Sequence, residues 1–276
     1  MEKVSILSMF RDSEDYIFDA LNRLEKLEQS TSNCVFEYYF YENDSVDNTV
    51  NILDKWLRNR TGEIKSEKLG KPKFSQSTSV QRQIDMTDYR NRMLNIKSPL
   101  ESNYTLILDS DVIYDEQLIN NYLEYFDDDV VMVTPNVLQN IKCKMFDPTK
   151  DSYYDSFALI DLEDNHGMTW TSNPFIRTED RQRWGEGLPI HVSSAFGGCP
   201  LIKTEVLNRV RWSTDGGCEH WNFCKQISTY GKIIVTPKII VKVNISEGII
   251  NSIANSHINN VIKFQRQKLN DQYIFK

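Results

Sequence analysis

The sequence predicts an α/β protein with a mostly parallel central sheet flanked by helices. Short apolar runs alternate with amphipathic helical patterns over roughly the first 135 residues, as in a doubly wound sheet. Turn-forming residues lie between these elements, for example in the NDSVDNT stretch at residues 43–49. A content of 40% hydrophobic and 26% charged residues is typical of a globular protein with ample material for a core.

Each predicted strand of the first half is a short run of aliphatic, β-branched or aromatic residues bounded by polar ones. Glu37 is the only charged residue of the second strand, and the fourth contains the uninterrupted run Thr105-Leu106-Ile107-Leu108. Such runs are typical of buried strands. The predicted strands comprise residues 4–8, 34–41, 65–69, 104–108 and 129–135.

The predicted helices of the first half carry apolar residues at three- and four-residue spacing. In the first helix, Ile17, Leu21, Leu24 and Leu27 share one face because of this spacing. The predicted helices comprise residues 13–27, 49–58, 86–95 and 118–125, and the polar residues 70–78 form a loop.

The second half of the sequence is less regular. Residues 140–189 are rich in Asp, Trp, Tyr, Asn and Pro, and a long stretch with so few periodic signals is usually functional. We expect a helix at residues 218–230, strands at 233–235 and 239–243, and a helical segment from 247 onward. The expected organisation is one domain over 1–276, with halves at 1–135 and 136–246 and a C-terminal segment at 247–276.

Charge and hydropathy exclude several classes of partner. The formal net charge is −7 and no long Lys or Arg run is present, which argues against nucleic acid. No run reaches about 18 apolar residues, so no membrane span is predicted. The N-terminus lacks a signal-peptide core and the five cysteines include no Cys-x-x-Cys pair, so we expect a cytoplasmic protein with reduced thiols.

The most informative feature is Asp109-Ser110-Asp111, which follows the predicted strand at residues 104–108. Ligands of open α/β sheets bind at the carboxyl ends of the strands. Two carboxylates this close repel each other unless a cation keeps both ionised, and hard oxygen ligands suit Mg²⁺ or Mn²⁺. The alternative is a strand-end turn with two solvated acids. This alternative stays open because a motif as short as Asp-x-Asp often occurs by chance.

Two further segments are expected near the same edge of the sheet. Asp44 follows the second strand, where it can accept hydrogen bonds from a nucleobase or ribose, whereas Asp47 is better explained as a helix cap. Arg90, on the helix before the Asp109 strand, is a candidate for pairing with a diphosphate. The alternative for Arg90 is an ordinary arginine on a helix surface.

Together these segments resemble those of GT-A fold glycosyltransferases. The resemblance rests on YENDSVDNT at residues 41–49, RNRML at 90–94 and ILDSDV at 107–112. The groups that the chain resembles most are the glycosyltransferases of large DNA viruses and the fungal capsule-associated mannosyltransferase family. The resemblance covers roughly the first 140 residues and, more loosely, residues 197–224. A virus-encoded enzyme acting in the host cytoplasm would fit it.

The resemblance implies a nucleotide-sugar site with a divalent metal. It places Asp109 and Ser110 near the ribose and sugar of a UDP- or GDP-sugar, and makes Asp111, together with Asp109, a ligand of Mn²⁺ or Mg²⁺. It also implies that an acid at the start of a later helix acts as the catalytic base of an inverting enzyme. Glu219 fits that position, His220 stands where a second acid is common, and His257 is a further candidate metal ligand.

The predicted function is therefore transfer of a hexose or deoxyhexose from a nucleoside-diphosphate sugar to a hydroxyl of a glycan or glycoconjugate. One alternative is a haloacid-dehalogenase-type phosphatase with Asp109 as nucleophile and Asp111 as acid. Another is a sugar-binding protein without turnover. We also expect Trp170 and Trp184, in the irregular stretch, to contact the acceptor, the alternative being that they pack in the core.

Overall fold

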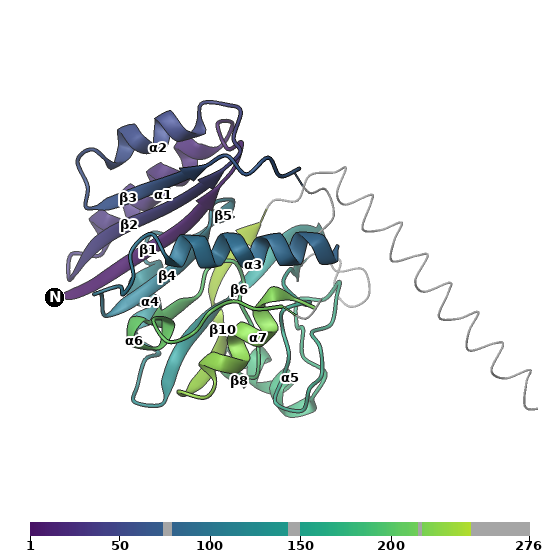
Figure 1. The fold of residues 1–276 in the computed structure, drawn as a ribbon. Coiled ribbons are helices and arrows are strands. Elements are labelled where there is room, and N and C mark those ends of the chain that lie inside the picture. Colours follow the sequence, from purple (N-terminus) through teal and green to yellow (C-terminus); the bar gives the residue numbers. More distant parts are fainter. Residues whose placement is uncertain (74–78, 143–149, 215–216, 244–276) are drawn as a thin grey trace, which may run out of the picture.

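A computed structural model describes residues 1–73, 79–142, 150–214 and 217–243, with no side-chain description for 140–142. Figure 1 shows a twisted central sheet with helices on both faces. This arrangement agrees with the α/β class and mostly parallel sheet that the sequence predicts.

Within the described residues, ten strands form one sheet in the order β3-β2-β1-β4-β9-β6-β10-β5, with β7 paired to β6 and β8 to β10. Strands β3, β2, β1 and β4 are mutually parallel, as are β6 and β10, whereas β9 is antiparallel to both β4 and β6. The strands are β1 (Glu2–Phe10), β2 (Cys34–Asn43), β3 (Gly62–Glu67), β4 (Tyr104–Asp109), β5 (Val112–Ile113), β6 (Val130–Lys142), β7 (Asp151–Tyr153), β8 (Ile190–Val192), β9 (Leu201–Lys203) and β10 (Lys232–Val243).

Aromatic side chains of β2 anchor helices on opposite faces of the sheet. Tyr38 packs edge-on against Trp56 of α2, with ring centroids 4.8 Å apart, whereas Tyr41 lies 6.2 Å from Tyr89 of α3. Successive side chains of a strand point to opposite faces, so α2 and α3 cover different sides. The helices are α1 (Ile17–Ser30), α2 (Thr49–Leu57), α3 (Val80–Leu94), α4 (Leu118–Leu123), α5 (Thr178–Gly185), α6 (Thr204–Leu207) and α7 (Glu219–Ile227).

Several predicted boundaries were wrong; for example, the strands predicted at 233–235 and 239–243 form the single strand β10, and the first helix begins at Ile17. Three further boundaries also differ. Strand β3 ends at Glu67 rather than 69, because the Leu69 N–H donates to the Asp44 side chain instead of a strand partner. Helix α3 begins at Val80 rather than 86, because Ser79 caps it by accepting the Arg82 N–H. Strand β6 continues past Pro135, and at that point the paired strand β10 has a register shift between Thr236 and Ile240.

Some expectations fall outside the described residues. These are the C-terminal helical segment from residue 247, His257, and parts of the loops at 70–78 and 140–189. The described part of 140–189 contains β7 and α5, so it is less irregular than predicted. No helix in the described ranges is both long and apolar enough to cross a bilayer.

The register of the parallel strands brings three strand ends together. At the end of β1, Met9 is paired with Asp109 of β4, and Phe10 is paired with Glu42 of β2. The loops that follow β1, β2 and β4 therefore leave the sheet at one edge. This is the edge at which α/β sheets bind ligands.

Candidate active site

Asp109, the last residue of β4, forms an ion pair with Arg90 of α3. The Arg90 Nη1 donates to Asp109 Oδ1 at 3.2 Å, and only 3% of Arg90 is exposed. Its guanidinium also lies 4.7 Å from the centroid of the Phe196 ring. The structure thus excludes a helix-surface position for Arg90 and places it directly beside the predicted ligand site.

The two residues after Asp109 differ in their surroundings. The hydroxyl of Ser110 lies 3.0 Å from the Tyr16 hydroxyl, in the segment that leads into α1. Asp111 is exposed as a residue, but the surrounding protein partly removes its carboxylate from water. The surrounding protein, and then the charge of Asp109, raise the pKa of Asp111. A bound cation would reverse this effect by favouring the ionised form.

Gly197 and Gly198 form a turn that lies against Asp109. Both have a left-handed backbone, with φ of +68° and +64°. A β-carbon on Gly198 would lie 3.2 Å from Asp109 Oδ2, and the Asp109 N–H donates to the Gly198 carbonyl at 2.8 Å. Glycine is required here because both the conformation and the close approach disfavour a side chain.

Asp155 is a site residue that sequence reasoning missed. Its Oδ2 accepts the Gly197 N–H at 2.6 Å. Burial raises the pKa of Asp155 to about 7, the Gly197 hydrogen bond opposes this, and the charges of Glu219 and Asp109 add to it. No motif marks Asp155 in the sequence; it follows β7, which pairs with β6.

Glu219 and His220 are the first two residues of α7 and are both buried, with 6% and 7% exposed. The His220 ring stacks on Phe196 with centroids 3.7 Å apart. Burial, and then the charge of Arg90, lower the pKa of His220 well below its ordinary value, so the imidazole is neutral. Its Nε2 lies 3.6 Å from Glu219 Oε1, which is therefore a contact between a neutral ring and an acid.

The carboxylate of Asp44 accepts hydrogen bonds from the loop that follows β3. Its Oδ1 accepts the N–H groups of Leu69 at 2.7 Å and Gly70 at 2.8 Å, and its Oδ2 accepts that of Lys71 at 3.1 Å. Burial alone would raise the pKa of Asp44, but hydrogen bonds from the Asn43 side chain and these amides outweigh it and lower the pKa to about 2. A nucleobase-binding role for Asp44 stays a prediction, since these contacts identify it first as a loop anchor.

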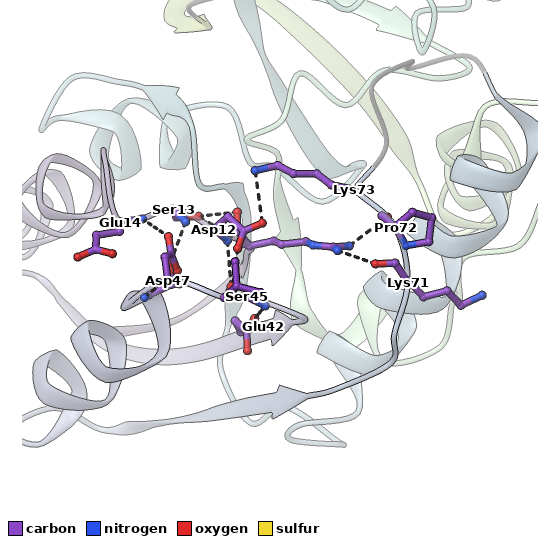
Figure 2. A network of polar contacts seen from close by, with 12 residues as sticks. Asp12, Ser13, Glu14, Glu42, Ser45, Asp47, Lys71, Pro72 and Lys73 are labelled. Carbon is purple, nitrogen blue, oxygen red and sulfur yellow. Dashed lines mark hydrogen bonds and ion pairs between the residues drawn. The ribbon is translucent and has the colours of Figure 1, made fainter.

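A network of polar contacts ties the loop after β1 to the loop after β2 (Figure 2). The Asp12 N–H donates to Ser45 Oγ at 2.9 Å, and Lys73 lies 3.6 Å from the Asp12 carboxylate. Asp47 accepts the N–H groups of Glu14 and Thr49, the latter being the first residue of α2. The N-cap position of α2 is Asn48, which makes no side-chain capping hydrogen bond, so Asp47 is not the N-cap that the sequence predicts. Asp47 precedes the N-cap and accepts the N–H of the first helical residue.

The tryptophans of the second half differ in burial. Trp184 is 8% exposed, its Nε1 donates to the Ser172 carbonyl, and its ring packs on Phe175. This environment favours the core-packing alternative for Trp184. In contrast, Trp221 is only partly buried and lies 5.1 Å from the ring of Phe157, which is 44% exposed.

The donor atoms at the end of β4 fit a divalent cation. Asp109 and Asp111 offer hard carboxylate oxygens, the ligands that Mg²⁺ and Mn²⁺ prefer. Within the described residues, no group of three His, Cys, Asp or Glu side chains could hold a metal ion. Two carboxylates suit an ion that takes its other ligands from a diphosphate and water. His257 lies outside the described residues.

Comparison with solved structures identifies the fold as GT-A. S. aureus TarS 1–349 in complex with UDP-GlcNAc is 13% identical, with a TM-score of 0.51 over 90% of this chain and 59% of that one. Mannosyltransferase PcManGT from Pyrobaculum calidifontis, in complex with GDP-Man and Mn²⁺, is 12% identical, with a TM-score of 0.53 over 90% and 58%. The chain thus spans less than two thirds of either protein. No known protein-family profile and no curated protein matches the sequence.

Proposed function

We propose that the protein is a metal-dependent glycosyltransferase that moves a sugar from a nucleoside-diphosphate sugar to a hydroxyl of a carbohydrate or glycoconjugate. The observation that carries this proposal is the carboxylate pair at the end of β4, with the buried Arg90 on Asp109. Phe196 connects Arg90 to His220, the residue after Glu219 at the start of α7. The GT-A fold supports the proposal, since the similar TarS and PcManGT structures contain UDP-GlcNAc and GDP-Man.

Asp109 and Asp111 are the residues that would hold Mn²⁺ or Mg²⁺. When bound, such an ion neutralises the charge that develops on the leaving diphosphate. Arg90 would fix the orientation of Asp109, and a direct contact of its buried guanidinium with a diphosphate stays a prediction. Ser110, hydrogen-bonded to Tyr16, lies between the two acids and is suited to contact the ribose or sugar.

Glu219 is the proposed catalytic base of an inverting reaction. It would accept the proton of the acceptor hydroxyl as that oxygen attacks the anomeric carbon and the diphosphate leaves. The neutral imidazole of His220 lies 3.6 Å from Glu219 Oε1, so His220 does not hold Glu219 in an ion pair. A retaining reaction would not need this base.

A product assay tests the proposal and separates it from the alternatives. The protein is incubated with single UDP- or GDP-sugars, Mn²⁺ and a mixture of oligosaccharides, and acceptor masses are measured together with released nucleotide. We expect a gain of one hexose or deoxyhexose, lost in Asp111→Ala and retained in Asp128→Ala, a control at an exposed acid. Phosphate release from phosphomonoesters without sugar transfer would identify a phosphatase. Donor binding without any product would identify a binding protein.

A further inference from the structure

The Gly197–Gly198 turn determines the space around the Asp109 carboxylate. Residues 198–200 run alongside the end of β4, because Asp109 donates its N–H to Gly198 and Ile107 donates to Pro200. The Gly198 carbonyl therefore accepts a hydrogen bond from Asp109, and the α-carbon of Gly198 faces the Asp109 carboxylate. A shift of this turn would move Asp109 or close the space beside it.

The turn is confined on its other side. A β-carbon on Gly197 would lie 2.9 Å from Pro135 Cδ, so the Gly197 backbone packs tightly on β6. Its N–H donates to Asp155 Oδ2 at 2.6 Å, which is short for an N–H to oxygen hydrogen bond.

Asp155 is itself held by the backbone on both sides of it. The Tyr154 N–H donates to the Val137 carbonyl of β6 at 2.9 Å, and the Asp155 carbonyl accepts the Leu159 N–H at 3.2 Å. Asp155 therefore connects a rigid part of the sheet to the turn beside Asp109. The charges of Glu219 and Asp109 also raise the pKa of its carboxylate, after the larger effect of burial.

From this geometry we infer that Asp155 is a positioning residue of the active site, which holds the Gly197–Gly198 turn against Asp109 by accepting the Gly197 N–H. Asp155 acts through Asp109 and transfers no proton. The inference rests on the proposed function, because its catalytic effect is measured on sugar transfer. A side chain that keeps the acceptor oxygen but lacks the charge should preserve the role.

Comparison of Asp155→Asn with Asp155→Ala tests this inference, with Asp128→Ala as the control. The amide oxygen of Asn can accept the Gly197 N–H, whereas Ala cannot. We expect Asp155→Ala to lower kcat/KM about 10- to 100-fold, the usual effect of a misplaced active-site group. We expect Asp155→Asn to recover most of this loss and to leave the pH profile of kcat unchanged. Parental activity in Asp155→Ala, or equal losses in both variants, would overturn the inference.

Two measurements keep the outcome decisive. Transfer by the parent protein is measured first. Absence of transfer in the parent protein would contradict the proposed function, whereas loss of transfer only in the variants bears on the role of Asp155. If Asp155→Ala does not fold, Gly198→Ala replaces it, since the added methyl would lie 3.2 Å from Asp109 Oδ2. We then expect at least tenfold weaker binding of Mn²⁺ and nucleoside diphosphate, and parental affinity would overturn the inference.

Discussion

The guanidinium of Arg90 donates to Asp109 at 3.2 Å, and Arg90 is almost fully buried whereas 32% of the Asp109 side chain is exposed. The ion pair fixes one oxygen of the Asp109 carboxylate, while the side chain stays partly open to solvent. Arg90 also contacts Phe196, on which His220 stacks. One arginine thus links the strand-end acids to the start of α7.

The first prediction concerns Arg90. Arg90→Ala removes one partner of the pair, and we expect a loss of about 2–3 kcal/mol in the free energy of unfolding, less than for a fully buried pair because Asp109 is partly exposed. Arg90→Lys keeps the charge but not the planar contact with Phe196, so we expect it to fold while losing activity. Urea unfolding and transfer rates measure the two effects. Unchanged stability in Arg90→Ala would contradict the structural role.

The second prediction is a pH dependence of stability from Asp44. Its pKa is about 2 in the folded protein, below the ordinary value near 4, so the ionised form stabilises the fold. This contribution is complete above pH 4 and disappears as the pH falls through about 2. Asp44→Asn should therefore be less stable than the parent at pH 7, and the difference should shrink below pH 4. A difference that stays constant down to pH 2 would contradict this assignment.

The third prediction contrasts two tryptophans. Trp184 is a core residue, so Trp184→Ala should cost about 3–5 kcal/mol of stability. Trp221 lies on the more open side of α7, two residues after Glu219, so Trp221→Ala should cost less stability and raise the KM for the acceptor. Melting temperatures and acceptor kinetics of both variants measure this contrast. An acceptor KM that changes only in Trp184→Ala would reverse the assignment.

The fourth prediction concerns Glu219. Glu219→Gln keeps the size and hydrogen bonding of the side chain but cannot accept a proton. We expect transfer to fall by about 10²–10⁴-fold, the usual contribution of a general base. Donor affinity should stay close to that of the parent. Transfer at the parental rate would place the base elsewhere or indicate a retaining reaction.

Local sequence patterns predicted where the candidate site residues lie relative to the helices and strands. Asp109 and Asp111 follow a buried strand, Arg90 lies on a helix, and Glu219 opens one, so each position could be recognised from its neighbours. The same reasoning could not separate a surface position from a buried one for Arg90. That distinction depends on Phe196, which is distant in sequence.

Other parts depend on long-range pairing that the sequence does not reveal. Asp155 reaches the site because β7 pairs with β6, and Gly197 lies nearby because β9 inserts antiparallel between β4 and β6. Asp44 was expected to face a ligand, yet its hydrogen bonds to residues 69–71 arise from tertiary structure. Short polar motifs indicate where an acid lies along the chain, but they do not show which groups donate hydrogen bonds to its carboxylate.

The central claim is that Asp109 and Asp111 create a metal-dependent nucleotide site. The most direct test is calorimetric titration of UDP and GDP into the parent protein and into Asp111→Ala, each with Mn²⁺ and with EDTA, with Asp128→Ala as control. The claim predicts that the parent and the control bind one nucleotide only when Mn²⁺ is present, and that Asp111→Ala remains folded but loses this binding. Equal affinity of Asp111→Ala and the parent in Mn²⁺, or binding by the parent that is the same in EDTA, would contradict it.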